Sequence, residues 1–507
     1  MKRLFPIRIL LAALGAALFS LPVHADQVYN TDIVVVGGGA TGLAAGVQAK
    51  MLGAEVIILE KQAIMGGSAN FAEGIFAAES AMQKRQGIDV SKKFAFQAIM
   101  NYSHWRANAP LVSAIVLKSA ETLEWLRQFG VNYEFIGVGG FGGPLTWHVV
   151  GELELNGKRY HHGNAVMVAL DKKFRDLGGT VLLQTPGKKL IKKDDRVVGV
   201  EGVNKDGEKV IVNAKAVVIG TGGYGNNKEM LQKYSRFPDV IMVGQAGKDG
   251  EGIQMAWEAG AAEEGAEIMI SYRPGLADFS TKSHLIAAAV QPYLYVDPNG
   301  RRYTDEYNIA EWPFSGNALE RIGGVAYSIY DEQTRQLFLN EGIQMPIGEW
   351  VTYGTRLDKL DEEFNKELAK NNGNVFKCGT IEEVAQKIGA DPDVLKETIA
   401  QNNNAAARHK DEQFFKNADF LRPVEIGPFY VTKLQPRALG TFGGIRINEK
   451  TEVVTAQGKA IPGLYAGGLD AGGMYGDSYD LEMGGASFAF ALNSGRIAAE
   501  NAVKYIK

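Results

Sequence analysis

Apolar runs and glycine-rich turns alternate along this chain. Residues 32–36 read Asp-Ile-Val-Val-Val and residues 55–59 read Glu-Val-Ile-Ile-Leu, patterns typical of buried parallel strands. Between them, residues 43–52 form a helical segment that a glycine ends. Residues 216–219 and 461–466 are further apolar runs that lead into glycine-rich turns. The pattern predicts an α/β fold with a parallel sheet.

The turn after the first strand reads Gly37-Gly38-Gly39-Ala40-Thr41-Gly42, a complete G-x-G-x-x-G motif. In such a motif the first glycine permits a tight turn, the second lets the backbone approach a pyrophosphate, and the third lets helix and strand pack closely. The helix N-terminus then offers free N–H groups and a positive dipole end to the phosphates. Glu60, at the end of the second strand, is placed to accept hydrogen bonds from a ribose. Together these features predict a dinucleotide site.

Later segments favour FAD over NAD as the dinucleotide. Gly66-Gly67-Ser68 and Ala72-Glu73-Gly74-Ile75 follow the second strand, and in many two-dinucleotide-binding flavoproteins such segments pass the ribityl chain and the isoalloxazine. Asp470 is placed for the ribityl hydroxyls, and Gly485 opens a last helix whose N–H groups would face the flavin. The candidate cofactor-binding residues are Gly37, Gly39, Ala40, Thr41, Gly42, Glu60, Lys61, Gly66, Gly67, Ser68, Ala72, Glu73, Gly74, Ile75, Thr221, Gly222, Gly223, Asp249, Gly468, Asp470, Gly485, Ser487 and Phe488.

Composition narrows the possible partners. The formal net charge is −4 and no basic stripe is present, which argues against nucleic acid. The single cysteine, Cys378, excludes an internal disulfide, a cysteine-based zinc site, an Fe–S cluster and C-x-x-C-H haem attachment. His148, His161 and His162 lack a third ligand at suitable spacing, so no metal site is predicted.

The N-terminus resembles a secretory signal. Three basic residues precede or enter an apolar run over residues 9–21, which is too short to span a bilayer comfortably. Residues 23–25, Val-His-Ala, form a small-x-small cleavage pattern. We expect residues 1–25 to be a signal peptide that directs the protein to the periplasm, with a membrane anchor as the alternative. No later stretch is continuously apolar, so the mature chain is not expected to be membrane-spanning.

Taken together, these glycine motifs resemble those of the fumarate reductase/succinate dehydrogenase flavoprotein superfamily. The resemblance is greatest to the soluble periplasmic fumarate reductase modules of flavocytochrome c type, and urocanate reductases and 3-ketosteroid dehydrogenases are related. It covers residue 32 to the end and is looser in the middle. It implies a Rossmann-like, two-dinucleotide-binding FAD domain built from residues 26–268 and 440–507, with an inserted α+β capping domain at residues 269–439.

The chain departs from this family where fumarate reductases bind and protonate their dicarboxylate. Fumarate is therefore not the expected substrate. The histidine that links the flavin covalently in succinate dehydrogenases is absent from residues 68–74, which implies non-covalent FAD. Six positions of the fumarate site fall on other residues in this chain: Arg273, Ala288, Gln291, Ala310, Gly440 and Glu482.

Reduction of an activated C=C bond requires a hydride at one carbon and an acid at the other. Five residues are candidates for substrate binding and proton transfer: Arg273, Tyr307, Glu311, Tyr475 and Tyr479. Arg273 takes a lost histidine position, Tyr307 and Glu311 flank a lost arginine, and the two later tyrosines precede the flavin-edge glycines. Ketosteroid dehydrogenases use tyrosines as acid and base, a likeness of chemistry and not of position. Packing roles, or an ion pair between Arg273 and an acid such as Glu482, are the alternatives.

The resemblance implies an exported reductase of an α,β-unsaturated organic acceptor other than fumarate. An exported flavoprotein has no NADH supply, so a cytochrome c or another flavoprotein would deliver the electrons. A dehydrogenase that introduces a C=C bond into a ketone or steroid-like substrate is the second hypothesis. A non-enzymatic flavin carrier is the third, and the capping domain argues against it because a cap serves to enclose a substrate.

Overall fold

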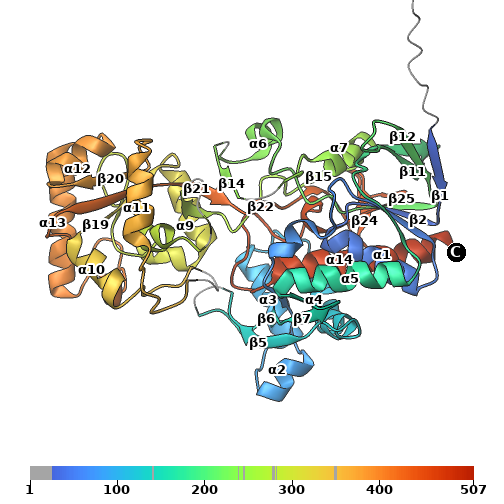
Figure 1. Cartoon of the computed structure of the whole chain (residues 1–507), viewed down its shortest axis with the longest axis horizontal. Helices are drawn as coiled ribbons and strands as arrows, with labels where there is room; N and C mark the ends of the chain where they lie inside the picture. Colours follow the sequence, from blue (N-terminus) through green and yellow to red (C-terminus); the bar gives the residue numbers. More distant parts are fainter. Residues whose placement is uncertain are drawn as a thin grey trace, which may run out of the picture.

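The computed structural model describes residues 26–139, 142–237, 239–243, 246–276, 280, 282–347 and 351–507. The predicted signal peptide, residues 1–25, lies outside these residues. The molecule is elongated, with one part built from both ends of the chain and the other from its middle (Figure 1).

A six-stranded sheet carries the part that contains both chain ends. Its strand order is β24-β25-β13-β2-β3-β9, and every pair is parallel except that of the edge strand β24. Strands β2, β3 and β13 are buried at every position, as strands covered on both faces must be. The four strands predicted from the sequence are confirmed. The sheet comprises β2 (Ile33–Val36), β3 (Val56–Leu59), β9 (Thr180–Leu182), β13 (Ala216–Ile219), β24 (Glu452–Val454) and β25 (Ala460–Ala466).

Long helices cover this sheet, and three of them run side by side in Figure 1. These are α1 (Ala40–Met51), α5 (His162–Asp176) and α14 (Ala486–Ile506). Helix α1 begins three residues before the predicted start, because the glycine-rich turn itself supplies the N-cap, Gly39. Helix α4 (Ala109–Arg127) packs beside α14, and α3 (Lys92–Tyr102) packs against α4.

Smaller elements surround this sheet. A four-stranded sheet comprises β1 (Gln27–Asn30), β12 (Lys209–Asn213), β11 (Arg196–Val203) and β10 (Gly187–Lys193), and a three-stranded sheet comprises β4 (Gly74–Phe76), β6 (Trp147–Val150) and β5 (Tyr133–Gly137). The remaining elements are the hairpin β7 (Leu153–Leu155) and β8 (Lys158–Tyr160), and helices α2 (Ala81–Gln86), α6 (Lys228–Tyr234) and α7 (Glu251–Glu258).

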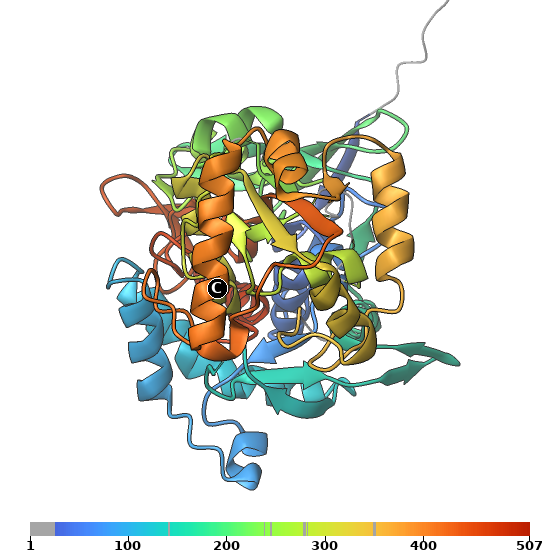
Figure 2. The ribbon, with the colours of Figure 1, turned by 90° about the vertical axis from the view of Figure 1, so that its left-hand side faces the viewer.

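The middle of the chain forms a second α+β unit with its own apolar core (Figure 2). Its longest strand, β21, pairs with strands on both sides. Its strands are β17 (Arg273–Gly275), β18 (Tyr295–Val296), β19 (Ala326–Tyr330), β20 (Val375–Cys378) and β21 (Phe429–Ala438), and β14 (Ile241–Met242), from the preceding part of the chain, pairs with β21. The helices are α8 (His284–Ala289), α9 (Trp312–Arg321), α10 (Glu332–Asn340), α11 (Leu360–Ala369), α12 (Ile381–Ile388) and α13 (Pro392–Arg408).

Two short antiparallel ladders join the two parts. Strand β16 (Met269–Ile270) pairs with β22 (Gly440–Thr441), and β15 (Glu263–Glu264) pairs with β23 (Gly444–Ile445). The chain therefore enters and leaves the second unit at adjacent points, and the expected domain boundaries fall on β16 and β22. Among the described residues, no helix is long and apolar enough to cross a membrane.

Candidate functional site

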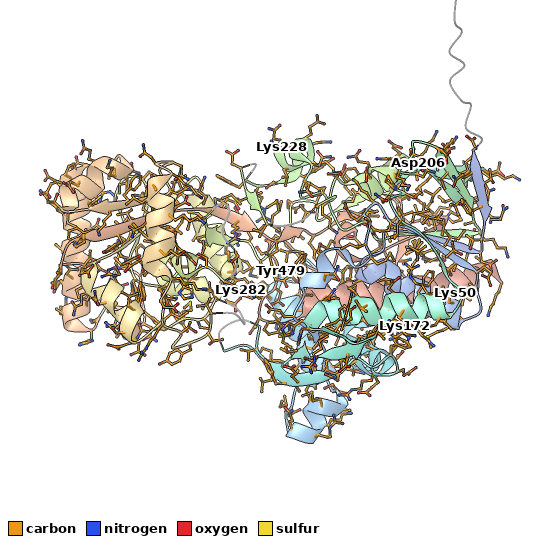
Figure 3. The ribbon with its side chains drawn as sticks, viewed as in Figure 1. Lys50, Lys172, Asp206, Lys228, Lys282 and Tyr479 are labelled. Carbon is orange, nitrogen blue, oxygen red and sulfur yellow. The ribbon has the colours of Figure 1, made fainter. Side chains whose placement is uncertain are left out.

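A cavity of about 1350 Å³ lies where the two parts of the molecule meet. It extends from the first glycine-rich turn to the side chains of the second unit, and Tyr479 and Lys282 both line it (Figure 3). Its wall combines backbone from β2–α1, the segment before β4 and the start of α14 with apolar side chains from the middle of the chain. A cavity at a domain junction is the usual place for a cofactor and its substrate.

The three motif glycines occupy distinct environments that match their predicted roles. Gly37 has φ of +105°, and a Cβ there would lie 2.3 Å from the Gly220 carbonyl oxygen. A Cβ on Gly42 would lie 1.8 Å from the Gly37 carbonyl oxygen, so helix and turn meet at this point. At Gly39 the nearest protein atom to such a Cβ is 3.8 Å away, and the residue lines the cavity. The space beside Gly39 is therefore open to a ligand and is not filled by another protein segment.

The predicted acidic residues of the cofactor site make short contacts with backbone. Glu60 accepts hydrogen bonds from the N–H groups of Gly38 at 2.7 Å and Gln62 at 2.6 Å. Lys61 forms an ion pair with Glu251 at 2.9 Å and a second with Asp249. Burial lowers the pKa of Lys61, but hydrogen bonds to these two carboxylates outweigh burial and the net pKa is raised. These contacts hold the loop before α7 against the end of β3.

Asp470 fixes the second glycine-rich turn. Its carboxylate accepts hydrogen bonds from the N–H groups of Thr221, Gly222 (3.1 Å) and Gly223 (2.7 Å). The side chain is fully buried, and burial raises its pKa while these hydrogen bonds oppose the shift. Asp470 does not line the cavity, although its neighbour Leu469 does. The structure therefore places it beneath the turn that borders the cofactor space.

Lys248 is a cavity residue that the sequence analysis missed. Its Nζ lies 3.5 Å from the Cβ position of Gly67 and 2.2 Å from that of Gly222, so it lies between the two glycine-rich segments. Burial lowers its pKa, and the negative charges of Asp470 and Glu60 oppose this shift. A cation at this point suits a phosphate-bearing ligand. The sequence analysis selected the neighbouring Asp249, but nothing in the sequence showed that Lys248, and not Asp249, lines the cavity.

The other predicted cofactor residues divide into two groups. Gly39, Ala40, Thr41, Gly66, Ser68, Ala72, Glu73, Gly74, Gly222, Gly485, Ser487 and Phe488 line the cavity. The cavity is not lined by Gly37, Gly42, Glu60, Lys61, Gly67, Ile75, Thr221, Gly223, Asp249, Gly468 and Asp470. An uncapped N-terminus of α1, a second one at α14, and the open space at Gly39 together fit FAD. FAD, when bound, supplies hydride transfer.

The three histidines named in the sequence analysis, His148, His161 and His162, do not form a metal site with other described residues. His148 is fully buried and hydrogen bonds to Ser80 Oγ at 2.7 Å and to the Thr146 carbonyl at 2.9 Å. Burial lowers its pKa to about 4. His161 and His162 line the cavity next to each other. Among the described residues, no group of three or more His, Cys, Asp or Glu side chains could hold a metal ion.

Arg273 lies in the cavity wall on β17. Its guanidinium carbon is 3.6 Å from the centre of the Trp312 ring, which is a cation–π contact. Burial lowers its pKa to about 9, the charge of Arg437 on the paired strand adds to this, and Glu73 opposes it. No ion pair between Arg273 and a carboxylate occurs among the described residues, so the alternative partner Glu482 does not neutralise it.

Tyr307 and Glu311 do not line the cavity. The Tyr307 ring packs against Phe420 with centroids 4.9 Å apart, and its N–H donates to Asp305. Glu311 caps the start of α9 by position, while its neighbours Ala310 and Trp312 face the cavity. Burial, with repulsion from Glu482, raises the pKa of Glu311 to about 7.

The two later tyrosines differ in exposure to the cavity. Tyr479 lines it, and its hydroxyl donates to Ser487 Oγ at 3.3 Å. Tyr475 lies one layer behind, with its ring centroid 5.1 Å from that of Tyr479 and 4.8 Å from that of Phe442. Burial raises the pKa of Tyr479 to about 12 and that of Tyr475 further. The structure thus brings Arg273 and Tyr479 to one cavity, and keeps Tyr307, Glu311 and Tyr475 outside its wall.

Comparisons with known proteins agree with this site. The family model described as FAD binding domain matches residues 32–485. A vinyl phenol reductase of Lactiplantibacillus plantarum is 34% identical over 487 residues, which is 94% of this chain and 96% of the relative. A cytochrome-dependent fumarate reductase of Shewanella frigidimarina is 29% identical, with 97% of this chain and 79% of the relative covered.

Among solved structures, the open conformation of a flavocytochrome c3 fumarate reductase is similar, with a TM-score of 0.69 and 26% identity. The alignment covers 94% of this chain and 79% of that one. The match of the family model over most of the chain, together with the glycine-lined cavity, settles the class. The chain belongs to the FAD binding domain family and is an FAD-dependent oxidoreductase.

Proposed function

We propose that this protein reduces the C=C bond of an apolar aromatic alkene of the vinylphenol kind, with electrons from an external carrier. The observation that supports this proposal most is the apolar wall of the cavity beyond the cofactor segments. Its side chains there are mostly apolar or aromatic: Ile270, Ile309, Trp312, Met345, Ile347, Tyr353 and Leu481. Such a wall excludes water and suits a ring better than a small dicarboxylate.

Similarity to the vinyl phenol reductase supports this substrate class. The two chains match over nearly their whole lengths, so the similarity includes the cap residues as well as the cofactor segments. The fumarate-binding pattern is absent at six positions of this sequence. Glu482 lies where this family's carboxylate-binding arginine is expected, and a carboxylate there would repel a dicarboxylate.

Arg273 gives the cavity a cation for the phenolic oxygen. A pKa of about 9 keeps the guanidinium largely protonated at neutral pH. A phenolate that binds there gains a charge-assisted hydrogen bond, and Trp312 holds the guanidinium plane in place. Orientation of the ring by Arg273 would then place the vinyl group toward the start of α14, where Tyr479 and Ser487 lie. Tyr479, in the cavity wall, is the candidate donor for the proton that the second carbon requires.

The direct test is product analysis with the purified mature protein. With a reduced viologen dye as the electron donor and without oxygen, 4-vinylphenol should be converted to 4-ethylphenol, measured by chromatography. Fumarate should give little succinate under the same conditions. Desaturation of a saturated ketone, with no reduction of any vinylphenol, would overturn the proposal in favour of a dehydrogenase.

The same proposal includes non-covalent FAD, export and a separate electron carrier. The segment before β4 carries no histidine, and residues 2–25 have the composition of a signal peptide. Acid precipitation should release the flavin into the supernatant, and the N-terminus of the secreted protein should begin at Asp26. Flavin that stays with the precipitated protein would contradict the non-covalent link.

A further inference from the structure

A layer of carboxyl groups lies directly behind the cavity wall. Ala310 and Trp312 line the cavity on either side of Glu311, and Tyr479 and Leu481 line it on either side of Asp480. The two carboxyl residues between these pairs do not belong to the wall. Repulsion between Glu311 and Asp480 contributes to the raised pKa of Asp480, so their carboxyl groups lie within electrostatic reach of each other.

Three segments that are far apart in the sequence are fastened together around this layer. Asn317 of α9 donates to Ser478 Oγ at 3.1 Å. The ring of Tyr102, at the end of α3, stacks on Phe314 of α9 with centroids 5.5 Å apart. Arg106 forms an ion pair with Asp477 at 3.1 Å. The end of α3, the start of α9 and the loop before α14 therefore enclose one site.

The carboxyl groups in this site lack the partners that buried acids usually have. Asp480 is 1% exposed; its Oδ1 accepts one hydrogen bond, from the Met483 N–H at 3.3 Å. Its Oδ2, and Oε2 of Glu311, are buried with no hydrogen-bond partner among the described residues. Burial of an unpaired carboxylate is costly, so both groups tend to hold protons.

We propose that Asp480 and Glu311 supply the proton of the reduction, and that it reaches the substrate through the hydroxyl of Tyr479. The inference rests on the proposed function, because it names the source of the proton for the same reaction. Tyr479 is the catalytic candidate, since it lines the cavity. Asp480 and Glu311 act through it and do not contact the substrate.

The step balances in atoms and electrons. The C=C π bond of the substrate breaks; one carbon receives the hydride that reduced FAD supplies, and the other receives the Tyr479 proton. The Tyr479 oxygen takes a proton from Asp480, and Asp480 is reprotonated from Glu311 and then from solvent. The Tyr479 phenolate that this donation leaves takes a proton readily from a carboxyl group with a pKa of about 7, because the pKa of the Tyr479 hydroxyl is about 12.

A vinylphenol makes this supply important. It carries no carbonyl to withdraw electrons from the alkene, so protonation of the vinyl carbon must accompany or precede hydride transfer. The Tyr479 hydroxyl gives its proton to the substrate carbon while its oxygen takes one from Asp480. The effective acid for the substrate is therefore the carboxyl layer. The reaction should then require protonated Asp480 and Glu311, and should slow as pH rises above about 7.

The groups that face Asp480 set this pH dependence. On its own loop these are Tyr475, Tyr479, Glu482 and the Met483 N–H, from α9 Glu311, and from α3 Tyr102. Burial is the largest cause of the raised pKa of Asp480; the charges of Glu482 and Glu311 raise it further, and the backbone N–H groups of Met483 and Glu482 oppose the shift. No cation among the described residues offsets these effects, so the pKa near 7 follows from burial of Asp480 beside two other carboxyl groups.

The test is stopped-flow reoxidation of the dithionite-reduced holoenzyme by 4-vinylphenol between pH 5.5 and 9. We expect the rate for the unmodified protein to fall above about pH 7. Asp480→Asn and Glu311→Gln should each lower it about tenfold or more, and the inflection near pH 7 should disappear when both carboxyl groups are replaced. Tyr479→Phe should be slow at every pH. In infrared spectra, Asp480 and Glu311 should each contribute a protonated-carboxyl band that titrates near pH 7, and each variant should lack the band of the residue it replaces.

Two controls separate structural damage from loss of the proton. Ferricyanide takes electrons and needs no carbon protonation, so it should reoxidise every variant at the unmodified rate. Asp477→Asn removes a carboxyl from the same loop, outside the layer, and should keep the unmodified pH profile. Unchanged rates and profile for Asp480→Asn and Glu311→Gln would overturn the inference while the proposed function stands. No reoxidation of the unmodified protein by any vinylphenol would instead remove the proposed function.

Discussion

Arg273 and Arg437 face each other across the paired strands β17 and β21, beside an apolar cavity. Two cations at this register destabilise each other, and burial adds to the cost. A substrate oxygen with negative charge relieves that cost when it binds. The strongest effect of Arg273 should therefore be on substrate affinity and not on the cofactor.

Replacement of Arg273 by Gln should raise the KM for 4-vinylphenol about tenfold or more, since one charge-assisted hydrogen bond contributes about 1.5–3 kcal/mol. The dissociation constant of FAD, from flavin fluorescence, should change little. Arg273→Lys keeps the charge but loses the flat stack on Trp312, and should recover only part of the affinity. An unchanged KM in both variants would remove Arg273 from the substrate site.

The raised pKa of Asp480 also makes a prediction for stability. The folded state holds the proton up to about pH 7, whereas the unfolded chain releases it near pH 4. This contribution to stability is complete below pH 4 and is lost as pH rises through 7. Denaturant unfolding of the holoenzyme at pH 5 and pH 8 should show a loss for the unmodified protein that Asp480→Asn reduces, on the order of a few kcal/mol. Equal losses in both proteins would contradict the burial of this proton.

At the residue scale, sequence patterns predicted the residues whose roles depend on the local backbone. Gly42 is a glycine because a Cβ would meet the Gly37 carbonyl of the same turn, and Gly37 has a φ of +105°, which favours glycine. Lys248 and Asp480 were not predicted, because their significance comes from segments that only the fold brings near. Tyr307 was predicted beside the site and packs instead within the cap, where a neighbouring aromatic ring takes its face.

The turn between β2 and α1 shows how one element separates folding from binding. Gly42 packs against Gly37, whereas Gly39 has ordinary helix-cap dihedrals, φ −80° and ψ −166°, and opens into the cavity. Both are motif glycines with the same sequence signal. Their roles should therefore separate by substitution.

Gly39→Val should lower FAD affinity about a hundredfold or more while the apoprotein keeps its thermal midpoint, because the added side chain enters only cofactor space. Gly42→Ala should instead destabilise the apoprotein by several kcal/mol, since its Cβ would overlap the Gly37 carbonyl. FAD titration and thermal unfolding of the apoproteins measure both effects. A Gly39→Val protein that binds FAD normally would contradict the cofactor placement.

The central strands and the last helix were predictable because their apolar runs are buried on both faces. The start of α1 was not, since nothing local distinguishes a glycine in a loop from a glycine at an N-cap. Short strands such as β16 and β22 carry no periodic signal, and they exist because the chain passes itself at the junction of the two parts.

On the scale of the whole molecule, the cap has its own apolar core and its own buried charge network. Arg302 binds Glu306 at 2.7 Å and Asp411 at 3.0 Å, and Lys416 binds Glu306 at 3.1 Å. All four side chains are almost fully buried. The network joins the segment before α9 to the loop after α13.

Glu306→Gln should destabilise the cap by about 3–5 kcal/mol, because it leaves two buried cations with one carboxylate. Calorimetry should show a lower first transition, while flavin release keeps its temperature. Glu412→Gln is the matched control: Glu412 pairs with Arg408 and Lys410 at the surface, and its loss should cost under about 1 kcal/mol. Equal effects of the two changes would contradict a separate buried cap network.

The most direct test of the whole account compares two acceptors on one sample. The protein, reduced without oxygen, is mixed with 4-vinylphenol or with fumarate, and the return of oxidised flavin absorbance is followed. We predict fast reoxidation by 4-vinylphenol and at least a hundredfold slower reoxidation by fumarate, because the cavity beyond the cofactor segments has a mostly apolar wall, with Arg273 stacked on Trp312 to bind a single phenolic oxygen. Fumarate as the faster acceptor would contradict the account.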